Sequence, residues 1–363
     1  MPELRKNPAD HSWVIIATER SKRPSDLIKK SQGAKEDKGG SRGANGGRPA
    51  PGTPEAGCPF CEGNENKTPP EVFAFRKPGT QPDTPGWTVR VVPNKFAALS
   101  PEGSPDRTKR GLWDTLNGVG AHEVIVEGTD HWASWPQKDS SQVTAILKAW
   151  QARYRAQGEK PFIRYTQLFK NHGLTAGASL AHPHSQLIST PFVPDQVQRE
   201  LDISRKYWES EGRCLYCDLL AAEEQEGIRA ISSTPYFLAF CPFASRFPSE
   251  VWILPRRHQP SFAAMDDVET EDLSALLIKI LGVFYAQLGD PPYNLILRTS
   301  PHGEQGAYAA YHWHLRLLPR LSIVAGFEWG TGIFINPSSP EEAAKFLAEH
   351  LGPSRLNQGE QTS

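Results

Sequence analysis

A set of cysteine and histidine residues occurs twice in this chain, in the same order each time: a Cys-x-x-Cys pair, a single histidine and a His-x-His pair. The two sets are Cys58, Cys61, His131, His182 and His184, followed by Cys214, Cys217, His258, His312 and His314. The first four residues of each set supply two thiols and two imidazoles, the tetrahedral ligands that structural Zn²⁺ prefers. A repeat of this kind predicts two structural zinc sites and a chain built from two similar halves.

Three alternatives to zinc account for the repeat less well. A redox Cys-x-x-Cys requires a βαβ context and leaves the ordered histidines unexplained. A nucleic-acid-binding zinc finger keeps its histidines within roughly a dozen or two residues of the cysteines, whereas here they lie far away. Chance can place one such set among eleven histidines but explains a matched pair poorly. We therefore expect the first zinc at Cys58, Cys61, His131 and His182, the second at Cys214, Cys217, His258 and His312, and the fifth cysteine, Cys241, in the core.

Hydrophobic periodicity predicts that helices and strands alternate similarly in the two halves. The strands are expected at 87–92, 122–127, 236–240, 251–254 and 293–298, and the helices at 140–157 and 270–288. This pattern predicts a duplicated α+β domain, with antiparallel sheets and packed helices, divided into domains 1–196 and 197–363. Polar stretches rich in Gly and Pro predict a mobile loop at 31–57 and a second loop at 100–112.

Charge and hydropathy exclude two classes of partner. Lys and Arg (40) nearly balance Asp and Glu (41), so no net basic field is present to hold nucleic acid by its phosphates. No segment approaches the length and apolarity of a membrane span or of a signal sequence, so we expect a cytoplasmic protein without membrane partners. A negatively charged substrate would then require a local cluster of donors and cations.

The first His-x-His pair carries the signs of a nucleophile. On a β-strand, side chains two residues apart share a face, so metal binding by His182 would hold His184 rigidly beside the site. The stretch before it, from Asn171 to Leu180, is a Gly-bearing polar loop that could offer N–H groups and hydroxyls to a phosphate. Gln186, two residues further on, has an amide that can donate to a phosphoryl oxygen. An imidazole that attacks the α-phosphorus of a nucleotide forms a phosphoramidate, which can pass the nucleotide on to an acceptor.

These residues resemble the galactose-1-phosphate uridylyltransferase family within the histidine-triad superfamily, along nearly the whole chain. The similar stretches are Arg20 to Pro24, Cys58 to Glu65, Asn94 to Leu99, Gly120 to Glu127, Asn171 to Gln186 and Gly326 to Glu328. The resemblance implies a histidine-triad-like fold, a nucleotidylated His184, a nucleoside-diphosphate sugar and a sugar 1-phosphate as substrates, and a place in galactose and nucleotide-sugar metabolism. A homodimer is compatible with the sequence, which does not determine the oligomeric state.

The resemblance also implies contacts for individual residues. Gln186 is catalytic together with His184, and the substrate-binding set is Arg20, Arg23, Asn94, Asn171, Gly177, Ser179, Phe327 and Glu328. In this set, Asn171 and Ser179 contact the phosphates, Asn94 the nucleoside, Arg20 and Arg23 the sugar phosphate, and Glu328 the hexose hydroxyls. Judged by residue type alone, Arg20 and Arg23 could be ordinary surface cations and Glu328 a solvated or paired carboxylate.

Departures from the family pattern leave the reaction open between two transfers. The Asn-Asp pair of the family appears here as Asn94-Lys95, whereas the stretches 326–332 and 290–294 are nearer to the plant ADP-glucose phosphorylase branch. That branch passes adenylate to inorganic phosphate and has a second Cys₂His₂ zinc site. Pro183 and Glu328 favour a hexose 1-phosphate as the acceptor. A histidine-triad hydrolase and a non-catalytic zinc scaffold are the alternatives from other classes.

Overall fold

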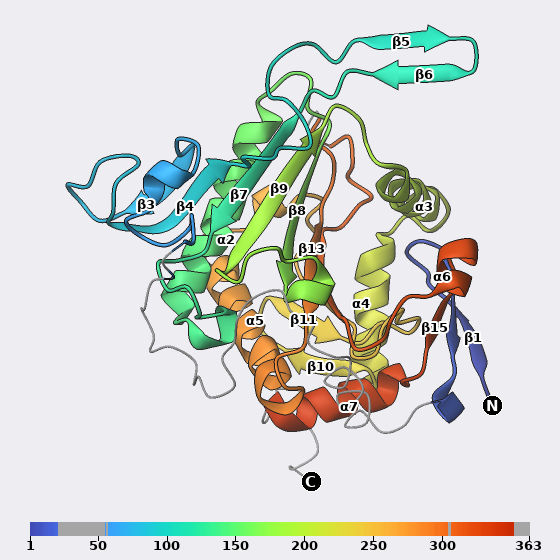
Figure 1. Ribbon diagram of the computed structural model, residues 1–363. Helices are drawn as coiled ribbons and strands as arrows, with labels where there is room; N and C mark the ends of the chain where they lie inside the picture. Colours follow the sequence, from blue (N-terminus) through green and yellow to red (C-terminus); the bar gives the residue numbers. More distant parts are fainter. Residues whose placement is uncertain (21–54, 56, 304–305, 352–363) are drawn as a thin grey trace.

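The structure is a computed structural model that describes residues 1–20, 55, 57–303 and 306–351 (Figure 1). Its centre is a ten-stranded sheet in which all neighbouring strands are antiparallel. In spatial order the strands are β10 (Ala230–Ser233), β11 (Phe237–Phe240), β12 (Val251–Pro255), β14 (His314–Pro319), β13 (Tyr293–Arg298), β8 (Tyr165–His172), β9 (His184–Thr190), β7 (Ala121–Val126), β4 (Trp87–Pro93) and β3 (Phe73–Arg76).

The strand order is the same in the two halves of the sheet. In each half the strands lie in the order first, second, third, fifth and fourth along the chain, and the fourth strands, β8 and β13, meet at the centre. Their register places Asn294 opposite Asn171 and Tyr293 opposite His172. The fourth strand of the expected first domain is therefore joined by hydrogen bonds to the second half.

Two long helices cover one face of the sheet, each placed between the third and fourth strands of its half. They are α2 (Ser140–Gly158) and α5 (Asp267–Gln287). Each begins at an aspartate whose carboxylate accepts an N–H of the first turn: Asp139 accepts from Gln142, and Asp266 accepts from Glu269. Their apolar faces merge with the sheet in one core that runs through both halves and includes the fully buried Trp150.

The opposite face of the sheet is covered differently in the two halves. Helices α3 (Asp195–Glu211) and α4 (Leu215–Glu226) pack on the second half through residues that include Leu201 and Tyr216. On the first half, the segment that carries Cys58 and Cys61 packs with Trp87, Val124 and Val126. The His-x-His pairs of the two halves therefore have different surroundings.

Smaller elements surround this body. A second sheet consists of β1 (Glu3–Lys6), β2 (Trp13–Ile16) and β15 (Phe334–Asn336), with β15 parallel to β2. The remaining helices of the described residues are α6 (Gly326–Thr331) and α7 (Pro340–Leu351). Short 3₁₀ turns are η1 (Thr18–Arg20), η2 (Glu65–Lys67), η3 (Trp135–Gln137), η4 (Leu174–Ala176) and η5 (Phe262–Ala264). A hairpin of β5 (Arg107–Arg110) and β6 (Trp113–Leu116) projects from the body (Figure 1).

The expected α+β class with an antiparallel sheet and packed helices is confirmed. All five predicted strands and both predicted helices form, with ends shifted by three residues or fewer. The loop expected at 100–112 is wrong in its second part, because 107–110 pair as β5 with β6 even though every residue of both strands is exposed. The loop expected at 31–57 lies outside the described residues except for 55 and 57. Domain duplication and the division at 196 stay predictions. No described helix has the length and apolarity to cross a bilayer.

Candidate active site and metal centres

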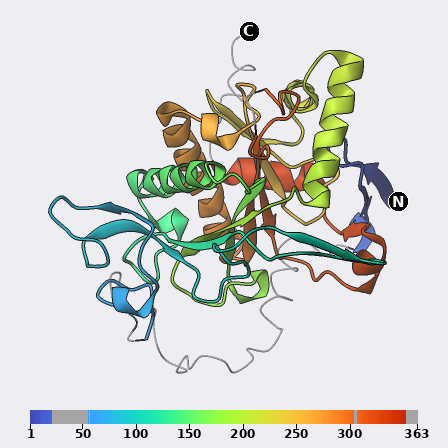
Figure 2. The same cartoon turned by 90° about the horizontal axis from the view of Figure 1, so that it is seen from above.

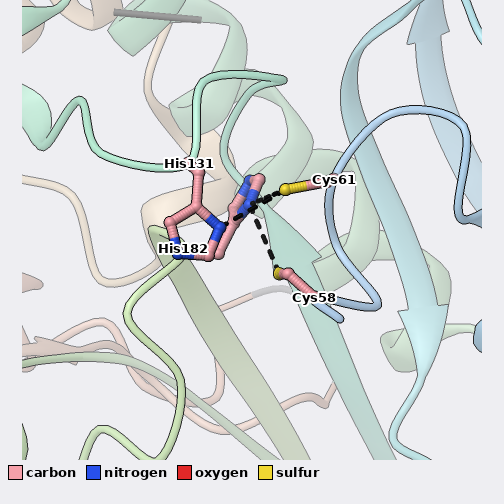
Figure 3. Close-up of side chains that lie close together, drawn as sticks. All are labelled: Cys58, Cys61, His131 and His182. Carbon is pink, nitrogen blue, oxygen red and sulfur yellow. Dashed lines mark hydrogen bonds between the residues drawn. The ribbon is translucent and has the colours of Figure 1, made fainter. Parts of the chain in front are cut away.

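The first predicted ligand set comes together in space (Figure 3). The Sγ atom of Cys61 lies 3.3 Å from Nδ1 of His131 and 3.7 Å from Nδ1 of His182, and the Sγ atom of Cys58 lies 3.7 Å from Nδ1 of His182. Zinc at about 2.3 Å from sulfur and about 2.0 Å from nitrogen, in tetrahedral geometry, would separate S and N by about 3.5 Å. The geometry therefore fits a Zn²⁺ ion, and all four residues are buried.

A hydrogen bond on the far side of the His182 ring orients this residue for metal binding. Its Nε2–H donates to the carbonyl of Gly128 at 2.8 Å, which leaves the lone pair of Nδ1 directed at the two thiols. Burial lowers the pKa of the His182 imidazole to about 3, so the ring is neutral, as a ligand must be. The same burial lowers the pKa of His131.

The second predicted set is also assembled. Nδ1 of His312 lies 3.5 Å from Sγ of Cys217 and 4.0 Å from Sγ of Cys214, and Nδ1 of His258 lies 3.5 Å from Sγ of Cys217. The Nε2–H of His258 donates to the carbonyl of Ala309. These distances fit the same tetrahedral arrangement, at a site where His258 is exposed. The convergence of both predicted sets is confirmed, and their occupation by zinc is a proposal taken up below. Cys241 is buried in the core, as expected.

The segment that carries the first Cys₂His₂ cluster holds His184 in place. Phe60, between the two cysteines, packs against the His184 ring with ring centroids 5.4 Å apart. The Nδ1–H of His184 donates to the carbonyl of His182 at 2.8 Å, which fixes the tautomer and leaves the Nε2 lone pair without a partner among the described residues. The backbone carbonyl of His184 accepts from Nζ of Lys170 at 3.2 Å.

The electrostatic surroundings favour a neutral His184. Burial is the main cause that lowers the pKa of its imidazole, and the ammonium group of Lys170 lowers it further. Lys170 is itself paired with Glu127 at 2.6 Å, both side chains being almost completely buried. A neutral imidazole with a free Nε2 lone pair is the form that can attack phosphorus.

The corresponding histidine of the second half, His314, is blocked. Its Nδ1 also bonds to the carbonyl of His312, but its Nε2 accepts from Nε of Arg316 at 3.0 Å. The ring is fully buried between Trp252, stacked at 5.1 Å, and Tyr216, at 4.8 Å. Arg316 occupies the position that Gln186 has in the first half, two residues after the second histidine. His314 therefore has no free lone pair for chemistry.

Gln186 lies on the same face of β9 as His184, as its spacing predicted, and its amide oxygen meets a histidine to which the sequence motifs gave no role. The Oε1 atom of Gln186 lies 2.8 Å from Nε2 of His122 on β7. The same Nε2 atom lies 3.0 Å from Nδ2 of Asn94, the residue expected to contact a nucleoside. Nε2 of His122 thus lies between the side chains of Asn94 and Gln186. His122 was part of a family-like stretch, but its partner on β9 depends on strand register.

The polar loop expected to bind phosphate lies between β8 and β9. It contains η4, which is flanked by Gly173 (φ 80°) and Gly177 (φ 92°), both in the backbone region that favours glycine. Asn171 ends this loop on the β8 side, where its Oδ1 accepts from Nδ2 of Asn294 on β13 at 2.8 Å. Gly177 and Ser179 are both exposed at the surface of this loop, within reach of solvent. Asn294 is a second residue of the site region to which the sequence motifs gave no role.

The remaining predicted substrate residues are not brought to His184 by the described part of the chain. Arg20 is exposed at the end of η1, and Arg23 lies outside the described residues. Phe327 and Glu328 belong to α6, which lies beside β15 at the edge of the molecule, away from β9 (Figures 1 and 2). The carboxylate of Glu328 accepts from the N–H of Ala325 at the start of its own helix.

Comparison with known proteins places this geometry in a family of enzymes. The galactose-1-phosphate uridyl transferase N-terminal domain matches residues 1–194, and a domain of unknown function, DUF4921, matches residues 120–359. The chain is 37% identical over 352 residues to an ADP-glucose phosphorylase of Arabidopsis thaliana, covering 96% of this chain and 93% of that protein. It is 29% identical to a galactose-1-phosphate uridylyltransferase of Thermotoga maritima, covering 96% of this chain and 98% of that one.

A solved structure shares the fold over nearly the whole chain. The crystal structure of an ADP-glucose phosphorylase from Arabidopsis thaliana with bound ADP-glucose superposes with a TM-score of 0.76 at 34% identity, covering 96% of this chain and 99% of that one. The chain therefore belongs to the galactose-1-phosphate uridylyltransferase family of nucleotidyltransferases. The resemblance drawn from the sequence motifs is confirmed at this level.

Proposed function

We propose that this protein transfers a nucleoside monophosphate from a nucleoside-diphosphate sugar to an acceptor phosphate through a covalent intermediate on His184. Nε2 of His184 attacks the α-phosphorus, the N–P bond forms, the P–O bond to the sugar phosphate breaks, and the sugar 1-phosphate leaves. The acceptor phosphate then takes the nucleotide and frees the imidazole. One observation carries this proposal: the Nδ1–H of His184 is fixed on the His182 carbonyl, which leaves Nε2 free among the described residues.

The surrounding residues have proposed roles in the same reaction. The amides of Gln186 and Asn171, with Ser179 and the backbone at Gly177, bind the phosphates, and Asn94 contacts the nucleoside. Arg20, Arg23, Phe327 and Glu328 remain proposed contacts of the sugar phosphate. Two Zn²⁺ ions in the Cys₂His₂ clusters are proposed to be structural: each has four protein ligands, whereas a catalytic zinc site keeps a position open. A homodimer stays a prediction.

We infer ADP-glucose as the donor and inorganic phosphate as the acceptor, which differs from the expectation based on Pro183 and Glu328. The relative that is 37% identical and the structural neighbour with bound ADP-glucose support this choice. Two features of the chain agree with it. Lys95 supplies no carboxylate to accept from the N3–H of uracil, and the Glu328 carboxylate already caps its own helix.

Uridylyl transfer to a hexose 1-phosphate is the second candidate. The family match and the 29% identical uridylyltransferase support it, together with the Pro183 of the His-x-His motif. Both candidates share the His184 intermediate and differ only in the base carried and the acceptor.

Intact-protein mass measurement separates the candidates. The protein is incubated with ADP-glucose and, separately, with UDP-glucose, and the added mass identifies an adenylyl or uridylyl group on the chain. The loaded protein is then mixed with inorganic phosphate or galactose 1-phosphate. An adenylyl adduct discharged by phosphate supports our proposal, and a uridylyl adduct discharged only by galactose 1-phosphate supports the second candidate. Rapid discharge by water alone would show a hydrolase instead.

A further inference from the structure

Two residues of the second half of the chain fix the loop that precedes His184. Arg320, which follows β14, donates from Nε to Oδ1 of Asn294 at 2.7 Å. Asn294, on β13, donates from Nδ2 to Oδ1 of Asn171 and to the carbonyl of Ala176, both at 2.8 Å. A guanidinium group can only donate, so it determines which end of the Asn294 carboxamide is oxygen. Both hydrogens of Nδ2 are then used on two carbonyl acceptors of the loop.

This arrangement in turn determines the orientation of the Asn171 carboxamide. Its Oδ1 is occupied by Asn294, so its Nδ2 must point the other way. The contact of Nδ2 within the described residues is the carbonyl of Gly177 at 3.5 Å, the outer limit of a hydrogen bond. The N–H groups of Asn171 are therefore left available to an acceptor such as a phosphoryl oxygen.

The same part of the second half also fixes the two ends of η4. Asn294 holds the carbonyl of Ala176 at the end of the turn. At its start, a Cβ atom on Gly173 would lie 2.9 Å from the ring of Pro292, so the backbone there packs closely against the second half. Pro292 accepts from the backbone N–H of Arg320 at 2.7 Å, and the Arg320 guanidinium lies over the Phe247 ring at 5.1 Å. Asn294 itself is 8% exposed.

We propose that Asn294 and Arg320 are positioning residues for the transfer reaction. Arg320 orients Asn294, and Asn294 holds Asn171 and η4 in the conformation in which the loop binds a phosphate of the nucleotide sugar. This inference rests on the proposed function, because it assumes the phosphate-binding role of the loop. It gives the second half of the chain, whose own His314 is blocked, a role in positioning the phosphate-binding loop of the first half.

The test begins with Asn294→Asp, which preserves the shape of the side chain and its acceptor for Arg320 but replaces two donors with an oxygen facing two carbonyls. The rate of nucleotidyl-histidine formation is measured in single-turnover mass experiments, and nucleotide-sugar binding by calorimetry. We expect the rate to fall about 10- to 100-fold. This is less than the effect of removing a transition-state hydrogen-bond donor completely, because Asn171 is misplaced but still present. The dissociation constant should change by less than about threefold, because the misplaced donor acts mainly on the transition state.

Asn336→Asp is the matched control. Asn336 is also a buried asparagine whose amide donates to a backbone carbonyl, that of Ser245, and whose oxygen accepts a backbone N–H, that of Ser338. It lies on β15 in the peripheral sheet, so its replacement should leave the transfer rate unchanged. A slowing as large as that of Asn294→Asp would attribute the effect to general destabilisation and overturn the inference.

Two further comparisons test whether Asn294 acts through Asn171 and whether Arg320 acts through Asn294. In a chain that already carries Asn171→Ala, adding Asn294→Asp should slow the reaction by no more than about threefold, because residues acting through one another are not additive. Effects that multiply in full would contradict the inference. Arg320→Lys keeps a donor and should retain most of the rate, whereas Arg320→Met should resemble Asn294→Asp. These Arg320 variants also give the answer if Asn294→Asp does not fold.

The outcomes distinguish this inference from the proposed function. If the parent protein forms no adduct with either nucleotide sugar, the proposed function fails. If the parent forms the adduct and Asn171→Ala slows it, but Asn294→Asp and Arg320→Met react at the parental rate, only the positioning role is overturned.

Discussion

Nε2 of His122 lies 2.8 Å from Oε1 of Gln186, and this contact decides which atoms of Gln186 can face a substrate. Nδ1 of His122 accepts from the backbone N–H of Ala98, so the proton of the neutral ring is on Nε2 and donates to Oε1. The amide nitrogen of Gln186 must then point away from His122. Because Nδ2 of Asn94 also lies 3.0 Å from Nε2 and can only donate, His122 cannot bond to both amides at once.

This relationship predicts the effect of His122→Phe. The variant keeps an aromatic ring but loses the Nε2–H that donates to Gln186, so the Gln186 amide is free to turn its oxygen toward the substrate. We expect nucleotidyl-histidine formation to slow by about 10- to 100-fold, with unchanged folding. Single-turnover mass measurement gives the rate, and His350→Phe on α7, where the ring bonds to its own helix, is the control. A rate within about twofold of the parent would show that the contact does not matter for transfer.

Replacing the proposed nucleophile should abolish the proposed covalent adduct without abolishing binding. For His184→Gly we expect nucleotide-sugar binding to persist and no acid-labile adduct to form, because the attacking Nε2 is gone. His314→Asn, in contrast, should label at the parental rate, because Arg316 and two aromatic rings already block His314. Labelling of the His184→Gly chain would assign the chemistry to another residue. Free imidazole should restore part of the turnover by filling the vacated space.

Metal analysis should find two zinc ions per chain in protein purified without a chelator. Each cluster supplies four ligands at distances that fit tetrahedral zinc, so Cys58→Ser and Cys214→Ser should each lose about one ion. Cys58→Ser should also lower the melting temperature, because the first cluster holds the segment that packs on β4 and β7. Cys241→Ser, which removes a buried thiol outside both clusters, should keep both ions. A stoichiometry near zero, or iron in the second cluster, would contradict the prediction.

The attachment of the N-terminal strand should weaken in acid. Burial raises the pKa of Glu341 on α7, but hydrogen bonds from Arg5 and Ser339 outweigh it and lower that pKa to about 2. A carboxyl group whose pKa is lowered on folding stabilises the protein above its ordinary pKa of 4.5 and loses that contribution as the pH falls from there to about 2. Because Glu341 is partly exposed, we expect a contribution of about 1 kcal/mol at neutral pH.

The measurement compares the parent with Glu341→Gln across pH. The parent should have the higher melting temperature at pH 7, and the difference should shrink toward zero as the pH approaches about 2. Glu342→Gln, the exposed neighbour on the same helix, should show no such difference. A difference between parent and Glu341→Gln that stays constant with pH would exclude an ionised Glu341 as its cause.

The sequence by itself determined the chemistry that is available. Spacing and order identified both Cys₂His₂ sets, because chance rarely repeats four metal ligands in the same order. Period-two alternation located β4 and β7, and the same periodicity placed Gln186 on the face of His184. These are local properties of a strand or a motif, which neighbouring residues in the chain specify.

The tertiary structure alone decided what surrounds each of the two His-x-His pairs and how those surroundings are oriented. His184 and His314 have the same local bonds to a preceding carbonyl, but only the fold brings Trp252, Tyr216 and Arg316 around His314. The pairing of β8 with β13 likewise sets Asn294 opposite Asn171, and that of β7 with β9 brings His122 to Gln186. Strand order and register arise from how the buried faces of distant segments pack together, and no local pattern in the sequence encodes that pairing.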